Sequence, residues 1–224
     1  MIELYLDTAD IGAVRRIDRC LPLRGVTTNP SILAKSKQGL QETLKGMSDV
    51  LTATPRFYAQ VVSPDVQGMV EEARQLNDMP YDMVVKVPAT EVGLTAIRQM
   101  KATGFNVLAT AIYSAQQGFL AALCGADYLA PYVNRIDAMN GNGVAVVADL
   151  QLLLNQHQLS AKILAASFKN TQQAMDVMKL GIGAITLPVD IAAQMLAHPA
   201  VQPAVEQFAQ DWQSTFGNKL SFES

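Results

Sequence analysis

The chain has 224 residues, of which 50% are hydrophobic and 17% charged, and 17 Lys and Arg against 20 Asp and Glu give a net charge of −3. A chain of this length can bury a full core without cross-links, and its low charge indicates an extensive core, surface hidden in an oligomer, or both. Mild acidity without basic runs argues against a nucleic-acid partner. Cys20 and Cys124 lie far apart, which excludes a disulfide framework and a zinc knuckle. We expect neither metal nor cofactor.

The N-terminal segment carries Glu3 where a secretion signal needs Lys or Arg. The longest uncharged stretch, residues 102–126, contains Asn106, Ser114 and two glutamines. These polar residues favour a buried strand followed by a helix over a membrane span. We therefore expect a reduced, cytoplasmic protein with no membrane partner.

Short apolar runs recur along the chain, and each ends in polar or turn residues. Their lengths and their content of Val, Ile, Leu and Ala are typical of buried parallel strands. In chain order the eight predicted strands are residues 2–7, 24–29, 56–61, 82–88, 106–111, 126–132, 161–167 and 183–188.

The segments between these runs are predicted to be helices. Ser63 and Pro64 have the pattern of an N-cap followed by Pro at the first helical position. Thr90, Ser114 and Thr171 are placed to begin three further helices, and residues 144–154 form another that ends near His157.

Eight strand–helix units in about 200 residues predict a single (β/α)₈ barrel, the TIM barrel, over residues 1–224. An open doubly wound sheet is the competing fold, but it usually carries a Gly-rich phosphate turn, which this chain lacks. Residues 190–217 exceed what a barrel needs and form a helical extension with an apolar stripe. That extension either closes the barrel floor or packs on a neighbouring subunit.

Catalytic groups of such barrels lie at the carboxyl ends of the strands. Seven of the eight predicted strands end in polar or functional side chains, whereas the eighth, around Thr186, offers little. In chain order the residues at these ends are Asp7, Thr27, Thr28, Asn29, Gln60, Lys86, Thr110, Tyr132, Asn134, Arg135 and Ser167.

Lys86 is the strongest signal, because it lies among valines in residues 83–88. Strand alternation places it on the face of Val84, toward either the barrel interior or the helix layer. Burial there would lower the pKa of its amine and make it a nucleophile that forms a Schiff base with a carbonyl. The alternative is a lysine that extends its charged end to the rim.

The other rim residues have structural alternatives as well. His157 and His198 close no strand, which excludes a Ser-His-Asp triad and a multi-histidine metal site. Acid–base chemistry would then fall to groups such as Tyr132, unless its hydroxyl is only a buried structural group. Arg135 suits a phosphate or pairs with Asp137.

Asp7 and Asn29 have the same ambiguity, because both are well placed to cap helices. Asp7 could instead orient a substrate hydroxyl. Ser167 lies close enough in the predicted rim to join Arg135 at a phosphate.

Four segments resemble the transaldolase family. Residues 25–33 (GVTTNPSIL) are similar to one family signature, and residues 85–90 (VKVPAT) to the signature around the Schiff-base lysine. Residues 130–137 (APYVNRID) and 164–169 (LAASFK) also look like family segments, whereas Val92 departs from the usual polar or small residue. The resemblance covers essentially the whole chain.

Gln60 and Tyr132 resemble the fructose-6-phosphate aldolase branch, because transaldolases have glutamate and phenylalanine there. This resemblance implies cleavage of fructose 6-phosphate to dihydroxyacetone and glyceraldehyde 3-phosphate through an iminium on Lys86. It also implies a decamer of two pentameric rings. It assigns proton transfer to Tyr132, with a water held by Gln60 and Thr110. It assigns the dihydroxyacetone hydroxyls to Asp7 and Asn29 and the phosphate to Arg135 and Ser167, and it places Thr27 near the substrate. Asn134 is added to the predicted substrate-binding residues from its place after the sixth strand. The alternatives are a transaldolase, a sugar-phosphate isomerase and a non-catalytic sugar-phosphate-binding barrel.

Overall fold

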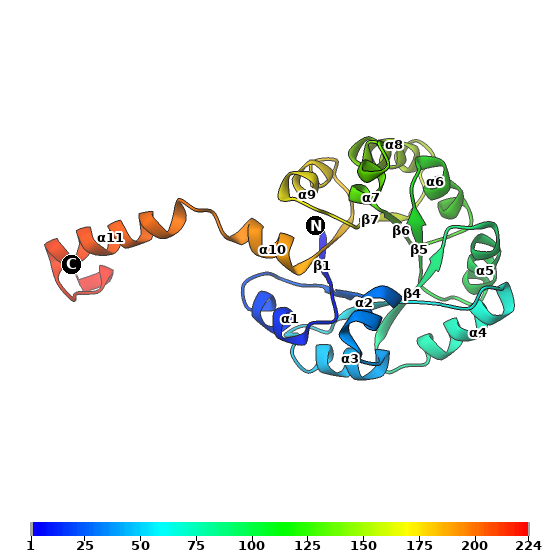
Figure 1. Cartoon of the computed structure of the whole chain (residues 1–224), viewed down its shortest axis with the longest axis horizontal. Coiled ribbons are helices and arrows are strands. Elements are labelled where there is room, and N and C mark those ends of the chain that lie inside the picture. Colours follow the sequence, from blue (N-terminus) through cyan, green and yellow to red (C-terminus); the bar gives the residue numbers. More distant parts are fainter. Residues whose placement is uncertain (1, 224) are drawn as a thin grey trace. The chain divides into compact units, whose positions relative to one another are not determined.

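The computed structural model describes residues 2–223. Eight parallel strands form a closed barrel in chain order, so the predicted (β/α)₈ fold is confirmed (Figure 1). The strands are β1 Glu3–Asp7, β2 Gly25–Thr27, β3 Arg56–Gln60, β4 Asp82–Pro88, β5 Val107–Ile112, β6 Tyr128–Pro131, β7 Lys162–Ala165 and β8 Ala184–Leu187.

Helices follow the strands and surround them in Figure 1. Because the helices cover the outer faces of the strands, both faces of each strand are buried, which explains the continuous apolar runs. The barrel helices are α1 Ile11–Asp18, α2 Pro30–Ser36, α3 Leu40–Ser48, α4 Val66–Asn77, α5 Glu91–Ala102, α6 Ala115–Leu123, α7 Val133–Ala138, α8 Gly143–Gln156 and α9 Thr171–Met178.

Helix starts were predicted well in some places and wrongly in others. Thr90 and Ser114 cap α5 and α6 as expected, each accepting a backbone N–H three residues later. The prediction of Ser63 as a cap was wrong, because Asp65 caps α4 through Gly68 N–H. The carboxylate of Glu72 accepts from the Ser63 hydroxyl and from the backbone N–H groups of Val62 and Ser63. Glu72, a residue of α4 itself, therefore stabilises the segment that precedes this helix.

Two apolar clusters build the barrel. The larger fills the layer between strands and helices, with Leu6, Phe57 and Ile97 among its members. The smaller fills the barrel interior and consists of Tyr5, Tyr58, Val84, Leu108, Tyr128, Ala130, Leu164 and Ala184. Because Val84 belongs to the inner cluster, strand alternation directs Lys86 into the barrel as well.

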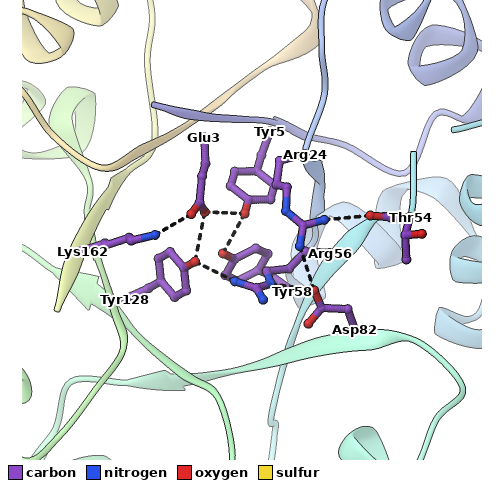
Figure 2. Close-up of polar contacts among 9 residues, drawn as sticks. All are labelled: Glu3, Tyr5, Arg24, Thr54, Arg56, Tyr58, Asp82, Tyr128 and Lys162. Atoms are coloured by element: carbon purple, nitrogen blue, oxygen red, sulfur yellow. Dashed lines mark hydrogen bonds and ion pairs between the residues drawn. The ribbon is translucent and has the colours of Figure 1, made fainter. Parts of the chain in front are cut away.

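The amino-terminal end of the barrel holds a dense polar network, which we call the base network (Figure 2). The Glu3 carboxylate accepts from the hydroxyls of Tyr5 and Tyr128 at 2.7 and 2.9 Å and from Lys162 Nζ at 2.7 Å. The other members are Arg24, Thr54, Arg56, Tyr58 and Asp82.

Arg56 lies at the centre of this network. It donates to Asp82 at 2.9 Å and to the Tyr128 hydroxyl at 2.8 Å, while Arg24 reaches the same Asp82 carboxylate. The rings of Tyr5, Tyr58 and Tyr128 meet edge to face at 5.1 and 5.5 Å between centroids. These rings therefore fill the barrel interior near its amino-terminal end.

The chain divides after Ala192 into two compact units. Helix α10 (Val189–Leu196) contains this boundary, and its residues Ile191 and Ala192 are buried in the barrel core. The second unit contains α11 (Val201–Phe216), followed by the 3₁₀ turn Ser221–Glu223. No helix in residues 2–223 is long and apolar enough to cross a membrane.

Candidate active site

A pocket opens at the carboxyl ends of the strands. Polar residues from six strands and the loops after them line it, which is the arrangement expected of a barrel enzyme. The polar side chains that line it are Asp7, Thr27, Asn29, Lys86, Tyr132, Arg135, Ser167 and Thr186, and its apolar wall consists of Leu108, Ala130, Leu164 and Ala166.

Lys86 lies at the bottom of this pocket, and its residue is 6% exposed. Its amine donates a hydrogen bond to the Thr28 carbonyl at 2.7 Å, which fixes the position of Nζ. Burial lowers the pKa of Lys86 below its usual value; the charge of Asp7 opposes this shift and that of Arg135 adds to it. The amine is therefore easier to deprotonate than an ordinary lysine, as a carbonyl-attacking nucleophile requires.

Asp7 and Thr27 are joined on one side of the pocket. The Thr27 hydroxyl donates to Asp7 Oδ1 at 2.7 Å and lies 2.8 Å from the Thr186 hydroxyl. Asp7 was considered as the cap of the first helix, but Asp10 performs that role through Ala13 N–H. The Asp7 carboxylate is therefore available to the pocket.

Tyr132 lies on the other side, just after β6. Its hydroxyl is 2.7 Å from that of Thr110, which is fully buried. Strand β5 has a register irregularity between Ala109 and Ile112, and within it Ala111 adopts a left-handed backbone conformation with φ of 57°. Such bulges redirect side chains near active sites. Here the bulge follows Thr110 directly.

Arg135 lies above Tyr132. Its guanidinium carbon is 4.5 Å from the centre of the Tyr132 ring, a cation–π contact, and Nη1 lies 3.5 Å from the Tyr113 hydroxyl. The predicted alternative of an Arg135–Asp137 ion pair does not form, because Asp137 accepts from Gly143 N–H and from Gln173. The hydrogen bond that Arg135 donates to the Tyr113 hydroxyl raises the pKa of Arg135, so a permanent positive charge remains exposed at the rim.

Two further residues, Asn29 and Ser167, line the pocket and also have a distinct feature of local structure. Asn29 caps α2 by accepting from Ile32 N–H at 3.0 Å, yet it also lines the pocket. The structural interpretation is thus confirmed, and a substrate role stays a prediction. Ser167 lines the pocket with φ of 63°, a conformation that is strained for a non-glycine residue and common at functional sites.

Three predicted site residues do not line the pocket. Gln60 pairs with Lys86 in the β3–β4 register but borders a surface groove with Leu33 and Leu76. Asn134 accepts a long hydrogen bond of 3.4 Å from Gln173. Thr110 lies behind Tyr132 and reaches the site only through the Tyr132 hydroxyl.

Two residues of the site were missed. Thr186 lines the pocket, although the eighth strand was expected to offer little. Ala184 lies in the barrel interior, so strand alternation could have placed Thr186, two residues later, on the same inner face. Tyr113 follows the bulge in β5, and regular alternation cannot predict what a bulge places at the rim.

His157 and His198 are exposed, as expected. Among residues 2–223 no group of three or more His, Cys, Asp or Glu side chains is arranged to hold a metal ion.

Solved structures show the same fold at low sequence identity. A thiamine phosphate pyrophosphorylase from Pyrococcus furiosus matches with a TM-score of 0.58 at 15% identity, over 96% of this chain and 98% of that one. A mandelate oxidase mutant with a monooxide FMN adduct matches with a TM-score of 0.57 at 14% identity, over 97% and 74%. The family model described as transaldolase/fructose-6-phosphate aldolase matches residues 4–223. With a buried lysine at the end of β4 and this match over almost its whole length, the chain belongs to the transaldolase/fructose-6-phosphate aldolase family.

Proposed function

We propose that this protein is a class I aldolase that cleaves fructose 6-phosphate reversibly to dihydroxyacetone and glyceraldehyde 3-phosphate. The observation that carries the proposal is Lys86, a buried amine of lowered pKa at the carboxyl end of β4. Family membership supports Schiff-base aldolase chemistry in general. The choice of fructose 6-phosphate and of free cleavage rests on residues around that lysine.

In this mechanism the Lys86 amine attacks C2 of the open-chain sugar, and loss of water gives an iminium. A base removes the proton of the C4 hydroxyl, the C3–C4 bond breaks, and its electrons pass into the iminium as an enamine. Glyceraldehyde 3-phosphate leaves, C3 is protonated, and water hydrolyses the new iminium to dihydroxyacetone and the free amine. Asp7 and Asn29 would hold the hydroxyls near C2, because both line the pocket with Lys86.

Tyr132 is our candidate for the proton transfers. It lines the pocket with Lys86, and Thr110 holds its hydroxyl at 2.7 Å. A positioned hydroxyl that protonates the enamine favours release of dihydroxyacetone over storage for a second aldehyde. Gln60 stays a candidate for holding the participating water, from its position opposite Lys86 in the register.

Arg135 and Ser167 would bind the phosphate. Both line the pocket, and Arg135 carries the positive charge nearest solvent among the lining residues. A guanidinium on an aromatic ring with a neighbouring hydroxyl suits a phosphate ester.

The test is cleavage of fructose 6-phosphate by the purified chain without any acceptor aldehyde. We expect stoichiometric free dihydroxyacetone and glyceraldehyde 3-phosphate, measured by coupled reduction of each product. Addition of borohydride with dihydroxyacetone should attach the ketone to Lys86, and peptide mapping would locate it. Transfer only in the presence of an acceptor would identify a transaldolase. An unmodified Lys86 would leave an isomerase or a binding protein.

Assembly into a homo-oligomer is part of the proposal. The apolar stripe of α11 supports it, because Val201, Val205 and Phe208 are each at least half exposed in the single chain. We expect a homo-oligomer, with the decamer of two pentameric rings as the expected size, and light scattering after size exclusion would measure it.

A further inference from the structure

Three side chains from three strands form a hydrogen-bonded line across one wall of the pocket. Thr186 of β8 lies 2.8 Å from Thr27 of β2, and Thr27 lies 2.7 Å from Asp7 Oδ1 of β1, each distance joining side-chain oxygens. Strands β8, β1 and β2 are neighbours in the barrel, so this line joins adjacent strands. Thr27 and Thr186 are 1% and 2% exposed.

The hydrogen-bonding capacities of these groups determine where the protons point. The Asp7 carboxylate offers only acceptors, so the single hydroxyl proton of Thr27 must be donated to Oδ1. Thr27 then has no proton left for Thr186, and the bond between the two hydroxyls requires Thr186 to donate. The line therefore runs in one direction, from Thr186 through Thr27 to Asp7.

This direction leaves one carboxylate oxygen unused. No donor in the described part of the chain bonds Asp7 Oδ2, and no buried side-chain polar atom there is without a partner. Asp7 lines the pocket and acts electrostatically on Lys86. Oδ2 is thus the oxygen with which Asp7 can accept a hydrogen bond from a ligand bound next to the lysine.

We propose that Thr186 is a positioning residue that directs the Thr27 hydroxyl onto Asp7 Oδ1, so that Oδ2 accepts a hydrogen bond from a hydroxyl of the ketone attached to Lys86. The inference rests on the proposed function and extends it to β8. It makes Thr186 important for hydroxylated ketones and unimportant for ketones without hydroxyls.

The experiment compares two ketones that present the same kind of carbonyl to Lys86. Dihydroxyacetone carries a hydroxyl on each side of its carbonyl, and acetone carries none. The rate of borohydride-dependent modification of Lys86 would be measured by mass spectrometry for the native chain, Thr186→Val and Thr186→Ser. Valine keeps the shape of threonine without its hydroxyl, and serine keeps the hydroxyl.

A matched control is Thr43→Val. Thr43 is also fully buried, but its hydroxyl bonds the Gly39 carbonyl at the start of α3, away from the pocket lining. Thermal unfolding of every variant would show whether the barrel is intact.

We expect Thr186→Val to lower the efficiency of modification by dihydroxyacetone about fivefold, the effect of one lost hydrogen bond, and to leave that by acetone unchanged. Thr186→Ser should stay within about twofold of native for both ketones, and Thr43→Val should match native. In a Thr27→Val background, where the line is already broken, Thr186→Val should have little further effect on the dihydroxyacetone reaction.

Two results would overturn the inference while the proposed function stands. One is a native-like reaction of Thr186→Val with dihydroxyacetone, and the other is an equal loss with both ketones, which would mean that the hydroxyl supports the lysine or the fold. If neither ketone modifies Lys86 in the native chain, the proposed function fails, and this inference fails with it.

Discussion

The two ends of this barrel are both rich in polar side chains, yet they use them in opposite ways. At the amino-terminal end, Glu3 receives three donors and Arg56 reaches both Asp82 and Tyr128. At the carboxyl end, Lys86 contacts a single backbone carbonyl, and Asp7 uses one carboxylate oxygen. A saturated network contributes to stability, whereas unused donors and acceptors at a pocket are available to a ligand.

The pKa shifts of Glu3 and Lys86 differ in the same way. Partial burial raises the pKa of Glu3, but hydrogen bonds from Lys162, Tyr5 and Tyr128 outweigh it, and the net pKa is lowered. The pKa of Lys86 is lowered because burial dominates over the attraction of Asp7. The charged form of Glu3 is therefore stabilised in the base network, whereas the charged form of Lys86 is destabilised in the pocket.

Replacement of Lys86 by Met should cause the largest effect. We expect cleavage to fall by at least about 1,000-fold because the nucleophile is lost. Folding should become about 1 kcal/mol more stable at neutral pH, because a desolvated amine is replaced by an apolar chain. Steady-state assays and urea unfolding measure the two changes.

The pH dependence of that stability difference has a definite sign. Since the pKa of Lys86 is lowered on folding, the unfolded chain binds this proton more tightly, and native stability rises with pH between the folded and the ordinary lysine pKa. The stability advantage of Lys86→Met over the native chain should thus shrink as the pH rises toward the ordinary lysine pKa. A constant advantage would show that the amine is not destabilised by burial.

Tyr132→Phe should have the next largest effect. Loss of a proton-transferring hydroxyl is expected to reduce cleavage about 100-fold, while borohydride still attaches dihydroxyacetone to Lys86. Tyr81→Phe is the control, because Tyr81 packs edge to face on Phe57 in the core layer. A native cleavage rate for Tyr132→Phe would remove this hydroxyl from the mechanism.

Glu3→Gln tests the other end of the barrel. An amide cannot accept all three hydrogen bonds that the carboxylate accepts, so we expect the free energy of unfolding to fall by about 2 kcal/mol and kcat to stay native. Because folding lowers the pKa of Glu3, its contribution is present above the ordinary glutamate pKa and is lost as pH falls through the folded pKa. Urea unfolding at several pH values should show the native and Glu3→Gln stabilities converge in acid. A large loss of kcat would instead couple the base network to the pocket.

The smallest expected effect is that of Tyr113→Phe. The hydroxyl lies 3.5 Å from Arg135 Nη1, a long and weak hydrogen bond, so KM for fructose 6-phosphate should rise only about twofold. Attachment of unphosphorylated dihydroxyacetone should not change. Equal effects of Tyr113→Phe on the fructose 6-phosphate reaction and on the attachment of dihydroxyacetone would mean that Tyr113 acts on Tyr132 and not on the phosphate. The two rings lie 5.6 Å apart between centroids.

The sequence predicted the fold because local signals repeat along the chain. Each apolar run became a strand, and strand β4 has the predicted bounds Asp82–Pro88. The inward direction of Lys86 could be predicted only in part. Strand alternation places Lys86 and Val84 on the same face, but when both faces of a strand are buried it cannot show which face lies inside the barrel.

Apolar runs and strand alternation could not predict contacts between residues that are distant in the sequence. Glu3 and Lys162 are 159 residues apart, as are Thr27 and Thr186, and only barrel closure between β8 and β1 brings such pairs together. The position of Tyr113 depends on a bulge in β5, which no repeating pattern announces. The pattern of strand ends and the family resemblance predicted most of the polar pocket residues. The prediction also included Gln60, Thr110 and Asn134, which the structure places outside the pocket lining.

The tyrosines at the base also affect the order of events in the proposed reaction. Tyr5 and Tyr58 are fully buried and fill the barrel beneath the pocket, so substrate and products share one entrance at the rim. Arg135 lies exposed at that entrance, and Lys86 lies buried below it. The phosphorylated aldehyde would occupy the outer position while the three-carbon fragment is covalently bound deeper in. Departure is then sequential, with the aldehyde first and dihydroxyacetone second, because a channel closed at one end releases its contents in order of depth.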